Sequence, residues 1–340
     1  MKRYFSTLIL LCLALFARAQ VFYTDGSSDL FSSNARTDLQ RKKLIDAHVM
    51  GLKVYLYEAD SLRAGKKDNG YLAQDLSYDK NGNLTRWYIK NKRGRIVNHY
   101  NYLYNDKNEY LQFTEFKRNG RVKFLMDNSF DNEGNCIETW RYYNDAPPSH
   151  VIQKFGTDHK LLESVYKFKN DRKFSGRYVF SYYDDGRKKQ TLEYDEKGKV
   201  IHTWNYDCSS VGKLASLHVK DTNKVCTRYE KDINGNPIKV KEEFQKDGPI
   251  RRTIEKYDIH DNMIEEEWYN ARGIIISHWA SVFNDKSEIV EYLKYKRGSD
   301  KLAERYTYMH NEDGLISEVH SFSKDNKPKH ITKYIYTKNL

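Results

Sequence analysis

The sequence has little that would interrupt a sheet. Its 340 residues include only 5 prolines, and a proline inside a central strand would remove a ladder hydrogen bond. All of them fall in or beside predicted turns: Pro147, Pro148, Pro237, Pro249 and Pro328. Long stretches of the chain can therefore pair as strands.

Long apolar runs are also lacking, with one exception at the N-terminus. Residues 1–19 combine a basic start, an apolar run over 8–16 and the small-residue pattern Ala17-Arg18-Ala19. This order is typical of a secretory signal peptide, which predicts cleavage before Gln20 and export to the periplasm, cell surface or medium. The run is shorter than the roughly 20 residues that span a bilayer, so we expect no transmembrane segment.

Cysteine is scarce as well. The sequence has 4 cysteines, and removal of the signal peptide leaves Cys136, Cys208 and Cys226, an odd number for an oxidising compartment. Cys136 occupies an apolar position two residues after a turn glycine. Counting strand register does not place Cys208 opposite Cys226, so we expect no structural disulfide.

The charge balance shows no large excess of one sign. There are 58 Lys and Arg against 47 Asp and Glu, a net charge of +11. The two signs are interleaved along the chain, which keeps strand edges soluble and does not gather basic residues into one patch. We therefore expect no nucleic-acid partner.

What the sequence does contain is a recurring turn. Glycines at Gly82, Gly94, Gly120 and Gly134, with an Asp-Lys-Asn turn over 106–108, mark turns every twelve to fourteen residues. Asn-Gly and Arg-Gly supply the positive φ angles of tight hairpins, and the segments between them are rich in Tyr, Phe, Val, Ile and Thr. The pattern predicts antiparallel strands joined by short turns.

The sixth residue after a turn glycine is usually large and apolar, whereas the seventh is mostly polar. The apolar set is Tyr88, Tyr100, Met126, Trp140, Leu192, Trp204, Ile254 and Trp279. Because side chains alternate between the two faces of a strand, we expect these residues to share one buried face and the other face to meet water.

The sequence thus predicts an all-β fold. Residues 51–340 form an elongated antiparallel β-hairpin repeat array of about twenty short strands, which can be open, coiled or closed. Residues 20–50 form a leader that is partly disordered or contains a short helix over 36–50, with Thr37 as its candidate N-cap.

Three turn segments carry a resemblance to a known family. They are YDKNGNL over 78–84, FDNEGN over 130–135 and YDEKGKV over 194–200. These segments resemble the YD repeat of RHS-type proteins, and the resemblance extends over most of 51–340. It implies a long β-hairpin sheet that can coil on itself, in a family of cell-surface and toxin-encapsulating proteins. This chain has no core-processing segment and no effector domain after the array, so we expect no toxin domain.

No catalytic or metal motif stands out. The 11 histidines include no pair at metal-ligand spacing with a third ligand nearby. The acidic runs 242–243 and 265–267 alternate between strand faces beside Lys and Arg, which favours solvated charge over paired catalytic carboxylates. No nucleophile elbow or phosphate loop is present. We expect no enzyme activity, no cofactor and no metal.

The aromatic residues offer the one candidate surface. Trp140, Trp204 and Trp279 fit the buried register, whereas Trp87 and Trp268 fall outside it. We therefore expect a protein or glycan surface at Trp87, Tyr88, Trp268 and Tyr269. The predicted function is an exported, non-enzymatic binding module at the cell envelope. The alternative is a structural or shell element of RHS type with no ligand of its own, which would turn every aromatic row inward.

Overall fold

The computed structural model describes most of the predicted array and the end of the leader. The described ranges are 40–58, 70–144, 146–168, 176–206, 222–245 and 248–339. The predicted signal peptide, its cleavage before Gln20, and Thr37 lie outside these residues.

The described chain is built almost entirely of strands. They are β1 (Val49–Glu58), β2 (Tyr71–Tyr78), β3 (Leu84–Lys90), β4 (Ile96–Tyr104), β5 (Tyr110–Phe116), β6 (Val122–Phe130), β7 (Cys136–Tyr143), β8 (Ala146–Phe155), β9 (Leu161–Phe168), β10 (Gly176–Tyr182), β11 (Lys188–Tyr194), β12 (Val200–Asn205), β13 (Thr222–Lys231), β14 (Pro237–Gln245), β15 (Gly248–Tyr257), β16 (Met263–Asn270), β17 (Ile275–Phe283), β18 (Ile289–Tyr295), β19 (Leu302–His310), β20 (Ile316–Ser323) and β21 (Pro328–Lys338). The all-β hairpin array is confirmed.

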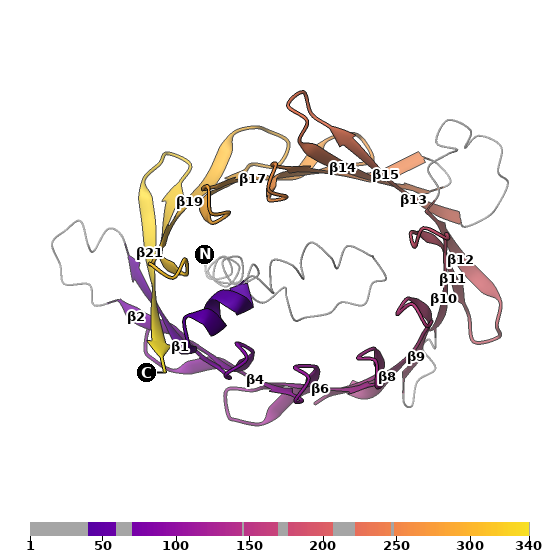
Figure 1. Cartoon of the computed structure of the whole chain (residues 1–340), viewed down its shortest axis with the longest axis horizontal. Coiled ribbons are helices and arrows are strands. Elements are labelled where there is room, and N and C mark those ends of the chain that lie inside the picture. The colour runs from indigo at the N-terminus through magenta and orange to yellow at the C-terminus, as the bar shows by residue number, and fades with distance from the viewer. Residues whose placement is uncertain are drawn as a thin grey trace.

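The strands form one sheet that closes on itself (Figure 1). Each strand pairs with the next, and β1 also pairs with β21, from Val49 opposite Lys338 to Glu58 opposite His330. All described pairings are antiparallel except that of β12 with β13. The β1–β21 pairing gives both terminal strands a second neighbour, so neither end of the array remains an unpaired edge.

The full repeat is a pair of strands. Turns at one edge of the sheet curl into the ring, while the hairpins of the other edge point outward (Figure 1). The inward turns recur every 26 residues where the repeat is most regular, starting at Asp79, Asn105 and Asp131, and again at Asp232, Asp258 and Asn284. Gly82 has a φ of 71°, which is the left-handed conformation that the turn sequence predicts.

The main core lies on the inner face of the sheet. Its buried members come from both ends of the chain: Leu52, Val54, Leu76, Trp87, Tyr102, Tyr110, Tyr306, Tyr308, Ile316, Val319 and Tyr334. Burial raises the pKa of the inner tyrosines, which reaches about 12 for Tyr100. The core therefore spans the β1–β21 closure and holds the two chain ends together by apolar contact.

A short helix over residues 40–46 lies inside the ring (Figure 1). It packs in a second apolar cluster made of Leu44, Ala47, Val49 and Leu315. Lys43 Nζ donates to Glu288 Oε1 at 3.0 Å and to the Gly314 carbonyl oxygen at 2.9 Å. The helix falls within the predicted segment 36–50, although Val49 already belongs to β1. Among the described residues, no helix has the length and apolarity to cross a bilayer.

The prediction that the sixth residue after each turn glycine lies on the buried face is wrong. After outward turns, the sixth residue beyond the glycine faces the core, as in Tyr100, Met126 and Trp279. After inward turns, it lies next to a buried residue and faces out, as in Tyr88, Trp140 and Leu192. Similar turns at opposite edges of a sheet are related by a 180° rotation about an axis that lies in the plane of the sheet, perpendicular to the strands. That rotation exchanges the two faces, so equivalent positions alternate between core and surface.

The expectation of no disulfide is also wrong. Cys226 is disulfide-bonded and only 1% exposed, while Cys136 is free and partly buried. The partner of Cys226 lies outside the described residues, as does Cys208. β12 and β13, the strands on either side of this connection, run parallel, whereas register counting followed antiparallel neighbours joined by short turns.

Candidate binding surface on the outer face of β3–β8

A stacked ridge of rings crosses the outer face of three neighbouring strands. Tyr88, His99 and Phe116 are direct cross-strand partners on β3, β4 and β5. The ring centroids of Tyr88 and His99 are 4.3 Å apart, and those of His99 and Phe116 are 4.5 Å apart. Such pairs stabilise a sheet and also leave an aromatic ridge on its surface.

A second aromatic group stands on β7 and β8. Trp140 and His150 are cross-strand partners whose rings stack at 3.8 Å with an interplanar angle of 8°. Glu138 fixes both, because its Oε1 accepts from Trp140 Nε1 at 3.2 Å and lies 2.6 Å from His150 Nε2. Tyr142 continues the group, is 40% exposed and stacks on Trp140 at 6.1 Å.

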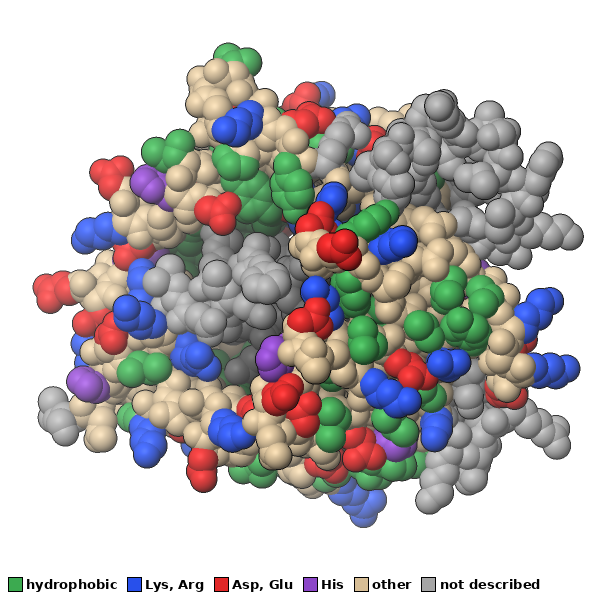
Figure 2. Space-filling view, turned by 45° about the vertical axis from the view of Figure 1, so that its right-hand side comes forward, with side chains coloured by type: hydrophobic (Ala, Val, Ile, Leu, Met, Phe, Trp, Pro, Cys, Tyr) green, Lys and Arg blue, Asp and Glu red, His purple; other side chains and the backbone are tan. Residues whose placement is uncertain are grey.

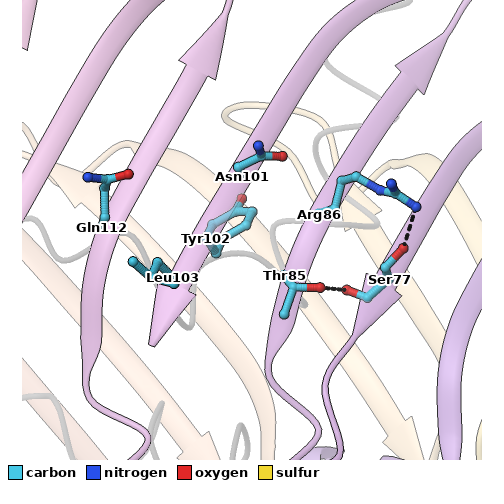
Figure 3. Close-up of a pocket in the computed structure, with 7 residues that line it drawn as sticks. All are labelled: Ser77, Thr85, Arg86, Asn101, Tyr102, Leu103 and Gln112. Carbon is cyan, nitrogen blue, oxygen red and sulfur yellow. Dashed lines mark hydrogen bonds between the residues drawn. The ribbon is translucent and has the colours of Figure 1, made fainter. Parts of the chain in front are cut away.

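A shallow polar groove lies beside the ridge on β2 to β5 (Figure 3). Its volume is about 550 Å³, and its lining is Ser77, Thr85, Arg86, Asn101, Tyr102, Leu103 and Gln112. Arg86 is the cross-strand partner of Asn101. Gln112 pairs with Asp127, which in turn pairs with Trp140, so the polar row runs directly into the second aromatic group.

The groove side chains are held by bonds to one another. Arg86 donates through Nη2 to Ser77 Oγ at 3.0 Å, and its guanidinium lies 5.2 Å from the Tyr88 ring centre. Gln112 Nε2 donates to Asp127 Oδ1 at 2.8 Å. Across the ridge, His99 Nε2 lies 2.9 Å from Asn101 Oδ1. We call this set of outer residues the β3–β8 surface: Arg86, Tyr88, His99, Asn101, Gln112, Phe116, Asp127, Trp140 and His150.

Of the predicted surface residues, Trp87 is in the core. It is 8% exposed, packs in the main cluster and donates through Nε1 to Gln74 Oε1 at 2.9 Å. The surface role expected for Trp87 is therefore wrong, because the inward turn before β3 reverses the face on which it falls. Its neighbour Tyr88 lies on the outer face, in the ridge.

Trp268 and Tyr269 are the other predicted pair. Trp268 is half-buried under the guanidinium of Arg251, 5.3 Å from its ring centre. Its Nε1 has no acceptor among the described residues. Tyr269 points to the opposite face, where burial and the Glu267 carboxylate raise its pKa. Trp87 lies on β3 and Trp268 on β16. Figure 1 shows the neighbouring strands of these two, β4 and β17, on opposite sides of the ring. The four predicted residues therefore do not form one site.

Glu265, Glu267 and His278 come together on the outer face of β16 and β17. Their ligand atoms lie within 4.8 Å of one another, close enough to hold a metal ion. Lys256 Nζ, however, already lies 2.6 Å from Glu265. Burial works to raise the pKa of Glu265, but hydrogen bonds from Lys256 and His278 outweigh it, so the pKa falls below its ordinary value.

Metal binding at this cluster would also leave a buried N–H group of His278 without an acceptor. His278 Nε2 faces Glu265 at 2.9 Å, while its buried Nδ1 has no hydrogen-bond partner among the described residues. Ligation through Nε2 would put a proton on Nδ1 with no acceptor, which metal-bound histidines normally have. The cluster is therefore better explained as an ion-pair network, and we assign it no metal.

Most of the β3–β8 surface was not predicted from the sequence. The available signal was the set of aromatic positions after inward turns: Trp140 was assigned to the buried register, and Tyr88 was placed both in that register and on the candidate surface. Arg86, Asn101 and Gln112 gave no signal, because they are brought together only by pairing of separate strands. Elsewhere, Figure 2 shows basic and acidic side chains interspersed over the face it presents, in line with the mixed charge of the sequence.

No known protein family and no curated protein matches the sequence. Solved structures resemble the fold only distantly. TcdB2–TccC3 has a TM-score of 0.31 and 9% identity over 77% of this chain and 18% of that chain. A porin-like protein from Bacteroides uniformis has a TM-score of 0.28 and 8% identity over 86% of this chain and 97% of that chain. This chain thus spans under a fifth of the TcdB2–TccC3 chain, and scores this low carry no argument about function.

Proposed function

We propose that this chain is an exported, non-enzymatic binding module that holds a glycan of the cell envelope on the β3–β8 surface. The observation that carries the proposal is an aromatic ridge that faces outward beside an open polar groove. A shell element without a ligand needs its aromatic rows only on the inner face, where they form the core. The disulfide at Cys226 and the signal-peptide pattern support an oxidising compartment.

The chemistry of the groove suits a sugar polymer. Asn101 and Gln112 offer amide donors and acceptors to hydroxyl groups, and Arg86 offers several donors. The ridge of Tyr88, His99 and Phe116 offers apolar ring edges along one side of the groove. The surface crosses β3 to β8, and a strand spacing of about 4.8 Å makes it roughly 24 Å long, enough for an extended chain.

A structural or shell element with no ligand is the second candidate function. The closed sheet and the aromatic inner face favour it, since both would suit a container of the RHS type that the turn segments resemble. The two proposals differ in what an outer-face substitution does. If the chain is a binding module, a substitution in the groove weakens ligand binding and leaves stability unchanged. If it is a shell element, the same substitution changes neither.

The test is to measure retention of the mature protein on insoluble peptidoglycan and on envelope polysaccharide. Gln112→Ala and Tyr88→Ser should each weaken retention severalfold while the melting temperature falls by only a few degrees. Val282→Ser is the control, because Val282 is 45% exposed on β17, across the ring from β4 (Figure 1). Wild-type protein that is not retained, or groove variants retained as well as the control, would favour the shell element.

A further inference from the structure

We infer that the glycan carries carboxylate groups and that Arg86 binds one of them. This inference rests on the proposed function and narrows the class of ligand. It follows from the way Arg86 is fixed and from the absence of an ion-pair partner for it among the described residues.

The guanidinium of Arg86 is positioned but not neutralised. Ser77 Oγ accepts one of its hydrogen bonds, and the Tyr88 ring supports one face. Among the described residues, no carboxylate forms an ion pair with Arg86. Most of its donors therefore point to solvent at the groove, in the planar fork that matches a carboxylate.

Elsewhere on the sheet, several basic side chains form ion pairs with acids at diagonal cross-strand positions. Lys90 lies 3.5 Å from Asp75, and Arg177 lies 2.5 Å from Glu163. The direct cross-strand neighbours of Arg86, Ser77 and Asn101, are neutral, and the acid at its diagonal position, Asp75, pairs with Lys90. Arg86 therefore forms no ion pair of its own among the described residues, and a ligand anion can take that place.

The charge of the whole surface favours a carboxylated sugar over a densely charged polyanion. Asp127, three strands away from Arg86, is fixed by Gln112 and forms no ion pair among the described residues. At the usual strand spacing the two charges are roughly 14 Å apart. A polymer with a sulfate or phosphate on every unit would be repelled at Asp127, whereas a sugar with hydroxyls and a single carboxylate uses Arg86 and the amides together.

Affinity electrophoresis of the mature full chain tests the inference, with hyaluronate, gellan, dextran sulfate and neutral dextran in the gel. In hyaluronate every second sugar carries a carboxylate, and in gellan every fourth sugar does. A carboxylated polymer should retard the wild type more than dextran sulfate or neutral dextran does. Arg86→Gln should weaken that retardation about tenfold, and Arg86→Lys should restore only part of it, because a lysine lacks the fork. Arg93→Gln is the control, since Arg93 is exposed in the next turn and outside the groove.

Each result has a defined meaning. Equal retardation of Arg86→Gln and the wild type, no retardation by either carboxylated polymer, or stronger binding to dextran sulfate would overturn the carboxylate inference. Binding to neutral dextran that is lost in Gln112→Ala but kept in Arg86→Gln would leave the proposed function standing while this inference fails. Melting curves of the variants guard against misfolding, and an exposed unpaired arginine should contribute little to stability.

Discussion

Six of the described inward turns are fixed by complementary pairs at their first and fifth residues. In one form, an aspartate accepts from the side-chain amide of an asparagine: Asp79 with Asn83, Asp131 with Asn135, Asp232 with Asn236, and Asp258 with Asn262. In the other form the roles are reversed, and an asparagine donates to a glutamate: Asn105 with Glu109 and Asn284 with Glu288. Each turn therefore has one donor and one acceptor at the same place.

This complementarity predicts a rescue. Asn262→Glu should place two carboxylates against each other and lower the free energy of unfolding by about 1–2 kcal/mol, since a charged hydrogen bond is lost as well. Adding Asp258→Asn recreates the Asn–Glu form and should restore most of the loss. Urea unfolding of the two single variants and the double variant measures the coupling. Additive effects would show that the two side chains do not act as a pair.

The same turns predict acid lability. For Asp258, burial acts to raise the pKa, but hydrogen bonds from the Asn262 side chain and from backbone amides outweigh it and lower the pKa. The pKa values of Asp131 and Asp232 are lowered by similar bonds. A carboxyl whose folded pKa is depressed contributes stability above its unfolded pKa of about 3.9 and loses it as the pH falls through the folded value.

The contribution of these aspartates to the urea midpoint should therefore be constant from pH 7 to about pH 5 and fall progressively below about pH 4. Asp258→Asn retains an acceptor oxygen for the backbone amides but cannot titrate, so its midpoint should fall less steeply with acid than that of the wild type. Parallel acid profiles for the two proteins would contradict this assignment.

At the scale of the element, β3 shows how one strand serves two faces. Trp87 packs inward against Tyr100, with ring centroids 5.1 Å apart, and its indole bonds the buried Gln74. Tyr88 faces outward in the ridge. Adjacent residues of one strand thus have separate roles, one in the core and one on the candidate surface.

The two residues should differ in their cost to stability. Trp87→Ala should lower the free energy of unfolding by about 3–5 kcal/mol, because it leaves a cavity and an unpaired amide on Gln74. Tyr88→Ala should cost only about 1 kcal/mol, the scale of a surface cross-strand pair. Denaturant unfolding of both variants provides the comparison, and equal losses would mean that the ridge is as buried as the core.

At the scale of the whole molecule, closure depends on the last strand. β21 pairs with both β20 and β1, and its Tyr334 and Tyr336 belong to or pack against the main core. The helix over residues 40–46 supports the same region from inside, since it contacts turns that flank the closure.

Deletion of residues 328–340 should open the ring. It would expose the edges of β1 and β20, which are templates for pairing with another chain. We expect the truncated protein to associate with itself and to unfold at a lower denaturant concentration than the full chain. Light scattering after size-exclusion chromatography, with urea unfolding, measures both. A truncated protein that stays monomeric and equally stable would show that the closure contributes little.

The sequence by itself determined the turns, the strands between them and the all-β class. These are local properties, because a glycine or asparagine with positive φ and a flank of β-branched and aromatic residues fix a hairpin without help from distant residues. The export signal is local in the same way, and it stays a prediction because residues 1–19 lie outside those that the structure describes.

Only the tertiary structure decided which face of each strand is buried. The repeat places Trp87 and Tyr88 next to each other, and the choice between them depends on the edge at which the preceding turn lies. Closure of the ring joins Val49 to Lys338, and the groove joins Arg86, Asn101 and Gln112 from three strands. Such contacts depend on how successive hairpins rotate and where the sheet meets itself, which no short window of sequence contains.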